Sequence, residues 1–114
     1  MIQRVSRAHV EVDGAVVGEV PEAGLVVLVG VTHGDGPEQV AWLARKIAEL
    51  RIFEGERSVE EIGGSVLVVS QFTLLGECRK GRRPSFTAAA PPETAEALYE
   101  VFVRHVMDHG VEVA

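Results

Sequence analysis

The stretch that decides the fold runs from residue 63 to residue 73 and reads Gly-Gly-Ser-Val-Leu-Val-Val-Ser-Gln-Phe-Thr. Its two glycines indicate a turn. The four apolar residues that follow the serine, 66–69, have the length and β-branching of a strand that is covered on both faces. Polar residues begin again at Ser70. The pattern predicts a buried strand that carries a short polar segment at its carboxyl end.

A second apolar run predicts another buried strand in the same sheet. It opens at Gly24 and extends from Leu25 to Val31 with almost no polar interruption. Between the two runs, residues 35–38 (Asp-Gly-Pro-Glu) combine a capping candidate, an early proline and an acid, which together indicate the start of a helix. The stripe that follows has spacings of three and four and consists of Val40, Leu43, Ile47 and Leu50. This segment is therefore an amphipathic helix that lies on the sheet.

The two ends of the chain complete the unit. Residues 5–11 alternate, Asp13-Gly14 is a tight-turn signal, and residues 15–17 are apolar, so we predict a β-hairpin. A second helix starts at Pro91-Pro92-Glu93 and ends at Gly110, with an apolar stripe of Ala95, Leu98, Tyr99, Phe102 and Val106. Residues 111–114 have the pattern of a starting strand. We predict one compact α/β domain, residues 1–114, with a mixed β-sheet and two packed helices.

Charge and composition exclude several classes of protein. The 114-residue chain has 17 acidic and 11 basic residues and a net charge of −6, whereas a protein that coats nucleic acid needs positive charge to neutralise phosphates. A local basic patch for one end of an RNA stays possible. The single cysteine, Cys78, excludes an internal disulfide. Neither a signal peptide nor a membrane-spanning run is evident, so we expect a soluble cytoplasmic protein.

The polar segment Ser70 to Thr73 is the first candidate for chemistry, because ligands of open α/β sheets tend to bind beyond the carboxyl ends of strands. A simpler interpretation is that the strand just continues into a polar turn. A hydroxyl nucleophile at Ser70 or Thr73 needs a base within hydrogen-bond reach. None of the four histidines falls in a serine-hydrolase motif, although a histidine distant in sequence stays possible. Oriented amides and the substrate itself are better candidates for acyl chemistry here.

Two further patterns concern ions. Cys78 has no cysteine partner, and His105 and His109 lack the glutamate of a zinc helix motif, so we expect no metal site. Residues 79–83 (Arg-Lys-Gly-Arg-Arg) hold four of the eleven basic residues. On an otherwise acidic chain this cluster indicates an anion site, although a loop of this kind can also be simply solvated.

Several segments together resemble the D-aminoacyl-tRNA deacylase family. They are Ile2-Gln3-Arg4-Val5, the run 24–31, Leu50-Arg51-Ile52-Phe53, the run 63–74 with Val-Ser-Gln-Phe-Thr-Leu, Gly81-Arg82-Arg83-Pro84-Ser85-Phe86, Ala95-Glu96-Ala97-Leu98-Tyr99 and Phe102-Val103. The resemblance extends from residue 2 to the end of the sequence. Val-Ser-Gln-Phe-Thr-Leu and Arg-Pro-Ser-Phe at this spacing are highly specific for the family.

The resemblance implies a barrel-like mixed sheet, a homodimer with a site near each dimer interface, and neither a metal nor an organic cofactor. It implies that the catalytic segment is Gln71, Phe72 and Thr73, with main-chain amides that polarise the ester carbonyl. It also implies a set of substrate-binding residues, namely Arg4, Ser70, Arg79, Lys80, Arg82, Arg83 and Phe86. Arg4 would support the loop that checks chirality. The nucleophile is either Thr73 or a water molecule assisted by the 2′-hydroxyl of the substrate's ribose, and the lack of an evident base favours the water.

Two departures from the family pattern stand out. The loop after Phe53, residues 54–58, is shorter than the family's loop with Gly-Lys-Met-Asn. The family also continues through two more strands, the last of which carries an Asn-x-Gly-Pro motif whose Gly-cis-Pro pair rejects L-amino acids in the partner subunit. The only Gly-Pro here is Gly36-Pro37, at the start of the first predicted helix. We expect either an incomplete version of the family protein or a shortened member without this selectivity element.

We therefore predict a proofreading hydrolase that cleaves the ester of D-aminoacyl-tRNA, and also that of mischarged glycyl-tRNA, with the 3′ acceptor end as its partner and no role for DNA or membranes. The main alternative is a non-catalytic module that binds a tRNA end or dimerises. A weaker third candidate is the related editing domain that is fused to some threonyl-tRNA synthetases.

Overall fold

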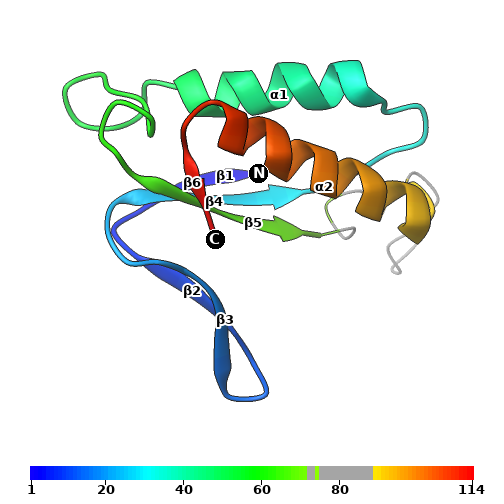
Figure 1. Cartoon of the computed structure of the whole chain (residues 1–114), viewed down its shortest axis with the longest axis horizontal. Coiled ribbons are helices and arrows are strands. Elements are labelled where there is room, and N and C mark those ends of the chain that lie inside the picture. Colours follow the sequence, from blue (N-terminus) through cyan, green and yellow to red (C-terminus); the bar gives the residue numbers. More distant parts are fainter. Residues whose placement is uncertain (72–73, 75–88) are drawn as a thin grey trace, which may run out of the picture.

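The computed structural model describes residues 1–71, 74 and 89–114 of the chain. These residues form a sheet with two helices on one face and a hairpin that projects from the other side (Figure 1). The sheet contains β1 (Ile2–Val5), β4 (Gly24–Val29), β5 (Ser65–Ser70) and β6 (Glu112–Val113), the hairpin contains β2 (Ala8–Val12) and β3 (Ala15–Val20), and the helices are α1 (Pro37–Glu49) and α2 (Pro92–Asp108).

The sheet is mixed, as predicted. Its strand order is β1-β4-β5-β6. β1 pairs with β4 in antiparallel orientation, whereas β4–β5 and β5–β6 are parallel. The two predicted helices are confirmed as well. The described strands form an open sheet and a separate hairpin, so no barrel closes within this part of the chain.

The first predicted strand is divided in the structure. β1 ends at Val5 and pairs with β4, while β2 starts at Ala8 and pairs with β3. The predicted hairpin is therefore confirmed, but Val5 belongs to a different sheet. The alternation of side chains continues from Val5 to Glu11 without a glycine or proline, so the sequence has no signal at the position where the chain leaves one sheet for the other.

The core lies between the sheet and the two helices. One face of β4 and β5 contributes Leu25, Val27, Val29, Val66 and Val68, and the helices contribute Val40, Ala44, Ile47, Ala48, Phe102 and Val106. The predicted stripe of α1 was wrong at Leu43, which is 37% exposed. Ala44 takes its place, because a small side chain lets the helix approach the strands closely.

Part of the opposite face of the sheet is covered by the base of the hairpin, near the end of β3. Leu67 and Val20 are buried there. Gly18 of β3 crosses β5 so closely that a Cβ atom at this position would lie 2.9 Å from the Cδ1 atom of Leu67. A larger residue at position 18 would require the Leu67 side chain to move. Gly18 therefore allows β3 to pack closely against β5.

The turn before β5 is closed by a reciprocal pair of hydrogen bonds. The Ser58 amide donates to Oε1 of Glu61 over 3.0 Å, and the Glu61 amide donates to the Ser58 hydroxyl over 3.2 Å. The two bonds have the pattern of a capping box. The Ser58 amide and hydroxyl hold the pKa of Glu61 below its usual 4.5. The ionised carboxylate is therefore the form that the turn prefers.

We predict that Ser58→Ala lowers the free energy of unfolding by about 1 kcal/mol at pH 7, because the Glu61 amide loses its acceptor. A lowered folded-state pKa stabilises the fold above the unfolded pKa, and this contribution is lost as the pH falls through the folded value. Glu61→Gln should therefore be less stable than the parent at pH 7 in urea unfolding and should approach it in acid. A difference of constant size down to acid pH would contradict this account of the turn.

Candidate functional site

Three segments meet where β4 and β5 end. Val29 pairs with Ser70 at the last position of both strands. The Gln71 amide donates to the Val29 carbonyl over 2.8 Å, and the Ala90 amide donates to the Val31 carbonyl over the same distance. The segment before α2 is therefore joined to the end of β4, beside the polar residues that leave β5.

The loop after β4 is held in place by its own side chains. Oδ2 of Asp35 accepts a hydrogen bond from the Thr32 amide over 2.9 Å, which closes a turn around His33. Thr32 also forms a bridge with Ala89. The exposed His33 is thereby carried on a short, anchored loop beside the start of α2.

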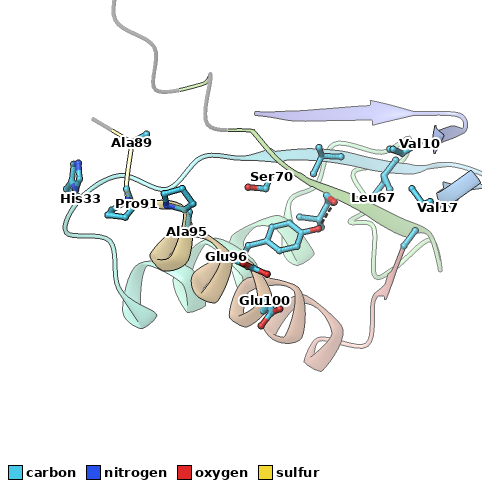
Figure 2. A pocket seen from close by; sticks show the side chains of 17 residues that line it. Val10, Val17, His33, Leu67, Ser70, Ala89, Pro91, Ala95, Glu96 and Glu100 are labelled. Carbon is cyan, nitrogen blue, oxygen red and sulfur yellow. Dashed lines mark hydrogen bonds between the residues drawn. The ribbon is translucent and has the colours of Figure 1, made fainter. Parts of the chain in front are cut away.

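A cavity of about 1090 Å³ opens between the hairpin, β5 and α2 (Figure 2). Its hairpin and β5 walls are mainly apolar, and its α2 wall includes Glu96 and Glu100. Ser70 and His33 lie toward the carboxyl end of β5. Other residues that line the cavity include Val17, Leu67, Val69, Ala95 and Tyr99. Ligand sites commonly combine apolar walls with a few polar groups in this way.

One hydrogen bond crosses the cavity wall. The Tyr99 hydroxyl of α2 donates to the Val68 carbonyl of β5 over 2.9 Å, drawn as the dashed line in Figure 2. Burial raises the pKa of Tyr99 above its usual 10.0. The hydroxyl is therefore protonated at neutral pH and serves as a stable donor to this carbonyl.

The site residues predicted from the sequence fall into three groups. Ser70 and Gln71 lie together at the end of β5, and Ser70 lines the cavity. Arg4 lies on β1, at the far edge of the sheet, where its Nη1 atom donates to the Ile52 carbonyl over 2.8 Å. The remaining predicted residues lie outside the described part of the chain: Phe72, Thr73, Arg79, Lys80, Arg82, Arg83 and Phe86.

Arg4 therefore connects β1 to the segment that follows α1. The Arg4 guanidinium bonds to a main-chain carbonyl and does not line the cavity. The contact is therefore compatible with a supporting role for Arg4. Tyr99 and His33 line the cavity but are not among the predicted site residues. The sequence pattern places Tyr99 in the apolar stripe of α2, where a tyrosine hydroxyl among aliphatic positions is a signal that a partner is needed. For His33 the sequence has no specific signal. It is one of four histidines, any of which could act as a base from a position distant in sequence.

The described residues contain neither a cluster suited to a metal ion nor a helix suited to a membrane. Within residues 1–71, 74 and 89–114, no group of three or more histidine, cysteine, aspartate or glutamate side chains could hold a metal ion. Over the same residues, no helix has the length and apolar character to cross a membrane. The polar groups that these residues bring to the cavity are side chains of Ser70, His33, Glu96, Glu100 and Tyr99 together with main-chain atoms.

Comparison with known proteins gives concordant results. The sequence profile of one family, described as D-Tyr-tRNA(Tyr) deacylase, matches residues 1–114. A protein from Beutenbergia cavernae named D-aminoacyl-tRNA deacylase is 59% identical over 114 residues, which are 100% of this chain and 81% of that relative. A protein of the same name from Heliobacterium modesticaldum is 56% identical over an alignment of 119 positions, which covers 100% of this chain and 79% of that relative.

Two solved structures share the fold. A c-Myc DNA Unwinding Element Binding Protein is 34% identical, has a TM-score of 0.87, and is matched over 98% of this chain and 80% of its own. A probable eukaryotic D-amino acid tRNA deacylase is 22% identical with a TM-score of 0.81, over 96% of this chain and 67% of its own. At that identity the second structure supports the fold alone.

Proposed function

Because the chain belongs to the D-Tyr-tRNA(Tyr) deacylase family, we propose that it hydrolyses the ester between a D-amino acid and the 3′ end of tRNA. The observation that carries the proposal is the match over all 114 residues to relatives named D-aminoacyl-tRNA deacylase, at up to 59% identity. The reaction is a proofreading step that releases free amino acid and tRNA. Mischarged glycyl-tRNA is a second proposed substrate.

The site supports this reaction through its main chain. The strand β5 ends at Ser70, and its polar segment begins there beside an open cavity. We assign the polarisation of the ester carbonyl to amides of the segment 70–73, with Gln71, Phe72 and Thr73 as the residues around the reacting ester. Water adds to the carbonyl carbon, the bond to the ribose 3′-oxygen breaks, and that oxygen takes up a proton.

The same proposal includes the finer predictions made from the sequence. Ser70, Arg4 and Phe86 support or contact the acceptor end, and Arg79, Lys80, Arg82 and Arg83 meet its phosphates. The active form is a homodimer in the cytoplasm, without a metal or organic cofactor. DNA is not a substrate, because a net charge of −6 opposes extended contact with a duplex.

We predict that the chain releases D-tyrosine from D-Tyr-tRNA faster than buffer does, with L-Tyr-tRNA measured in parallel. Release of labelled tyrosine gives both rates, and their ratio measures how much chiral selectivity residues 1–114 carry. Binding of both substrates without hydrolysis of either would contradict the proposal. That result would instead favour the alternative, a non-catalytic module for the tRNA end.

Substitutions at Thr73 distinguish the two candidate nucleophiles, the threonine hydroxyl and water. We predict that Thr73→Ala and Thr73→Ser both retain measurable hydrolysis, because the sequence offers no evident base to activate a threonine hydroxyl. A substrate that ends in 2′-deoxyadenosine should be nearly inert, because it lacks the hydroxyl that assists the attacking water. Mass spectrometry of the parent protein during turnover is the check, and a covalent aminoacyl adduct on Thr73 would exclude water as the nucleophile.

The basic cluster 79–83 can be tested by its salt dependence. Neutralising Arg82 and Arg83 to glutamine should raise KM for D-Tyr-tRNA. It should also lower the slope of log binding constant against log salt, by roughly 0.7 to 0.9 for each phosphate that is no longer neutralised. The change in kcat should be smaller, because distant phosphate contacts hold substrate and transition state about equally. Arg45→Gln, at an exposed position of α1, is the matched control. A slope equal to that of the control would show that the cluster is merely solvated.

A further inference from the structure

The dipeptide Asp-Gly occurs twice in the chain, at Asp13-Gly14 and at Asp35-Gly36. An aspartate reacts most readily with its own main chain in this dipeptide, because the glycine has no Cβ atom to obstruct its amide nitrogen. The two copies have the same intrinsic chemistry. A difference in their reactivity therefore comes from the fold around them.

We propose that Asp13-Gly14 is a site of spontaneous isoaspartate formation, whereas the fold protects Asp35-Gly36 from the same reaction. The Gly14 amide nitrogen attacks Cγ of the Asp13 carboxyl group, the N–Cγ bond forms, and the carboxyl hydroxyl leaves as water with the amide proton. Water then adds to the main-chain carbonyl carbon of the cyclic imide, and the bond from that carbon to the nitrogen breaks. The main chain afterwards passes through Cγ, and the former main-chain carbonyl is a carboxylate. This inference does not depend on the proposed function.

The first pair lies where its nitrogen is sterically open. Asp13 and Gly14 form the turn between β2 and β3, at the tip of the projecting hairpin (Figure 1). Their φ angles are 52° and 80°, both positive, as in the two-residue turn that joins tight hairpins. Both residues are exposed. A Cβ atom built on Gly14 would meet no atom within 4 Å, so nothing crowds the attacking nitrogen.

Neither reacting group of this pair is held by a partner. With the residues that the structure describes, the Asp13 carboxylate forms no hydrogen bond or ion pair, and the Gly14 amide forms no hydrogen bond. The reaction therefore breaks no existing contact at either group. It needs only a rotation of the main chain that brings the nitrogen to Cγ.

That rotation is a local event, because few strand pairs hold the tip. The register of the hairpin shifts between Val10 and Glu11, and beyond this irregularity only the pairs Glu11–Val16 and Val12–Ala15 remain. Residues 11–17 are all exposed, so opening of these pairs uncovers no buried side chain. Local openings of this kind require much less free energy than global unfolding.

The second pair is held at both reacting groups. Oδ2 of Asp35 accepts the Thr32 amide over 2.9 Å, and the Gly36 amide donates to Oε1 of Gln39 over 2.9 Å. Gly36 is also the N-cap of α1, and its carbonyl accepts the Val40 amide over 3.2 Å. Attack by the Gly36 nitrogen would disrupt the first turn of α1, whose Val40 belongs to the core.

The modification has a structural consequence for the hairpin. It lengthens the main chain of the turn by one atom, because Cβ of Asp13 becomes part of the backbone. A two-residue turn has a fixed geometry, so we expect the neighbouring pair Val12–Ala15 to be disturbed. Val10 and Val17 of the same hairpin line the cavity, and the modified turn therefore bears on that wall.

The test follows isoaspartate at both positions in the whole chain at neutral pH over several weeks. Digestion with an endoproteinase that cuts at aspartate but not at isoaspartate, followed by mass spectrometry, measures each position separately. In the native chain isoaspartate should form about tenfold faster or more at Asp13 than at Asp35, because the tip opens more readily. In concentrated urea the two rates should be similar, since the protecting contacts are lost.

Gln39→Ala is the matched variant, because it removes the acceptor of the Gly36 amide and leaves the hairpin unchanged. It should speed up the reaction at Asp35 and leave the rate at Asp13 as in the parent. An unchanged rate at Asp35 would contradict the proposed protection by this contact.

Equal rates at Asp13 and Asp35 in the native chain would overturn the inference. So would isoaspartate that forms at both positions in urea but not at Asp13 in the folded protein, since the turn would then be protective. None of these measurements uses hydrolysis of aminoacyl-tRNA. Failure of the proposed function is therefore distinguishable from failure of this inference.

Discussion

The parallel pairing of β4 with β5 is the constraint on which the rest of the structure depends. The two strands are in register from Gly24 opposite Ser65 to Val29 opposite Ser70. Parallel strands are stable when both faces are covered, and here α1 and α2 cover one face while the hairpin covers part of the other. Because the strands are parallel and equally long, their continuations emerge together, Gly30 after β4 and Gln71 after β5. The position of the site therefore follows from the place where β4 and β5 end together.

Different elements contact the two strands of this central pair along their outer edges. β1 covers the free edge of β4 over its first four residues, but in the described part of the chain β6 covers only the first two residues of β5. A helix side chain, Tyr99, supplies the next hydrogen bond. This bond joins α2 to β5 at the wall of the cavity.

The elements that were predictable from the sequence are those with a strong local signal. The buried strands, both helices, the hairpin turn and the starting strand after Gly110 follow from apolar runs, periodicity and turn residues, and residues 70 and 71 follow from their place after a strand. The division between Val5 and Ala8 could not be predicted, because alternation continues across it. The burial of Ala44 instead of Leu43 depends on how closely α1 approaches the strands. Neither this distance nor the pairing of Tyr99 with Val68 has a local signature, since both arise from contacts between segments far apart in sequence.

The charge distribution bears on how a polyanion would approach such a site. The chain has a net charge of −6, and four of its eleven basic residues fall within 79–83. Since fields at exposed charges decay over about 8 Å at physiological salt, a local basic cluster can hold a phosphate despite a repulsive body. On α2, Glu96 and Glu100 line the cavity and disfavour phosphates along that wall. Under the proposed function, repulsion from these two carboxylates would keep the phosphates of the acceptor end away from the α2 wall. The ester would then meet the end of β5, while the phosphates would stay outside the apolar cavity.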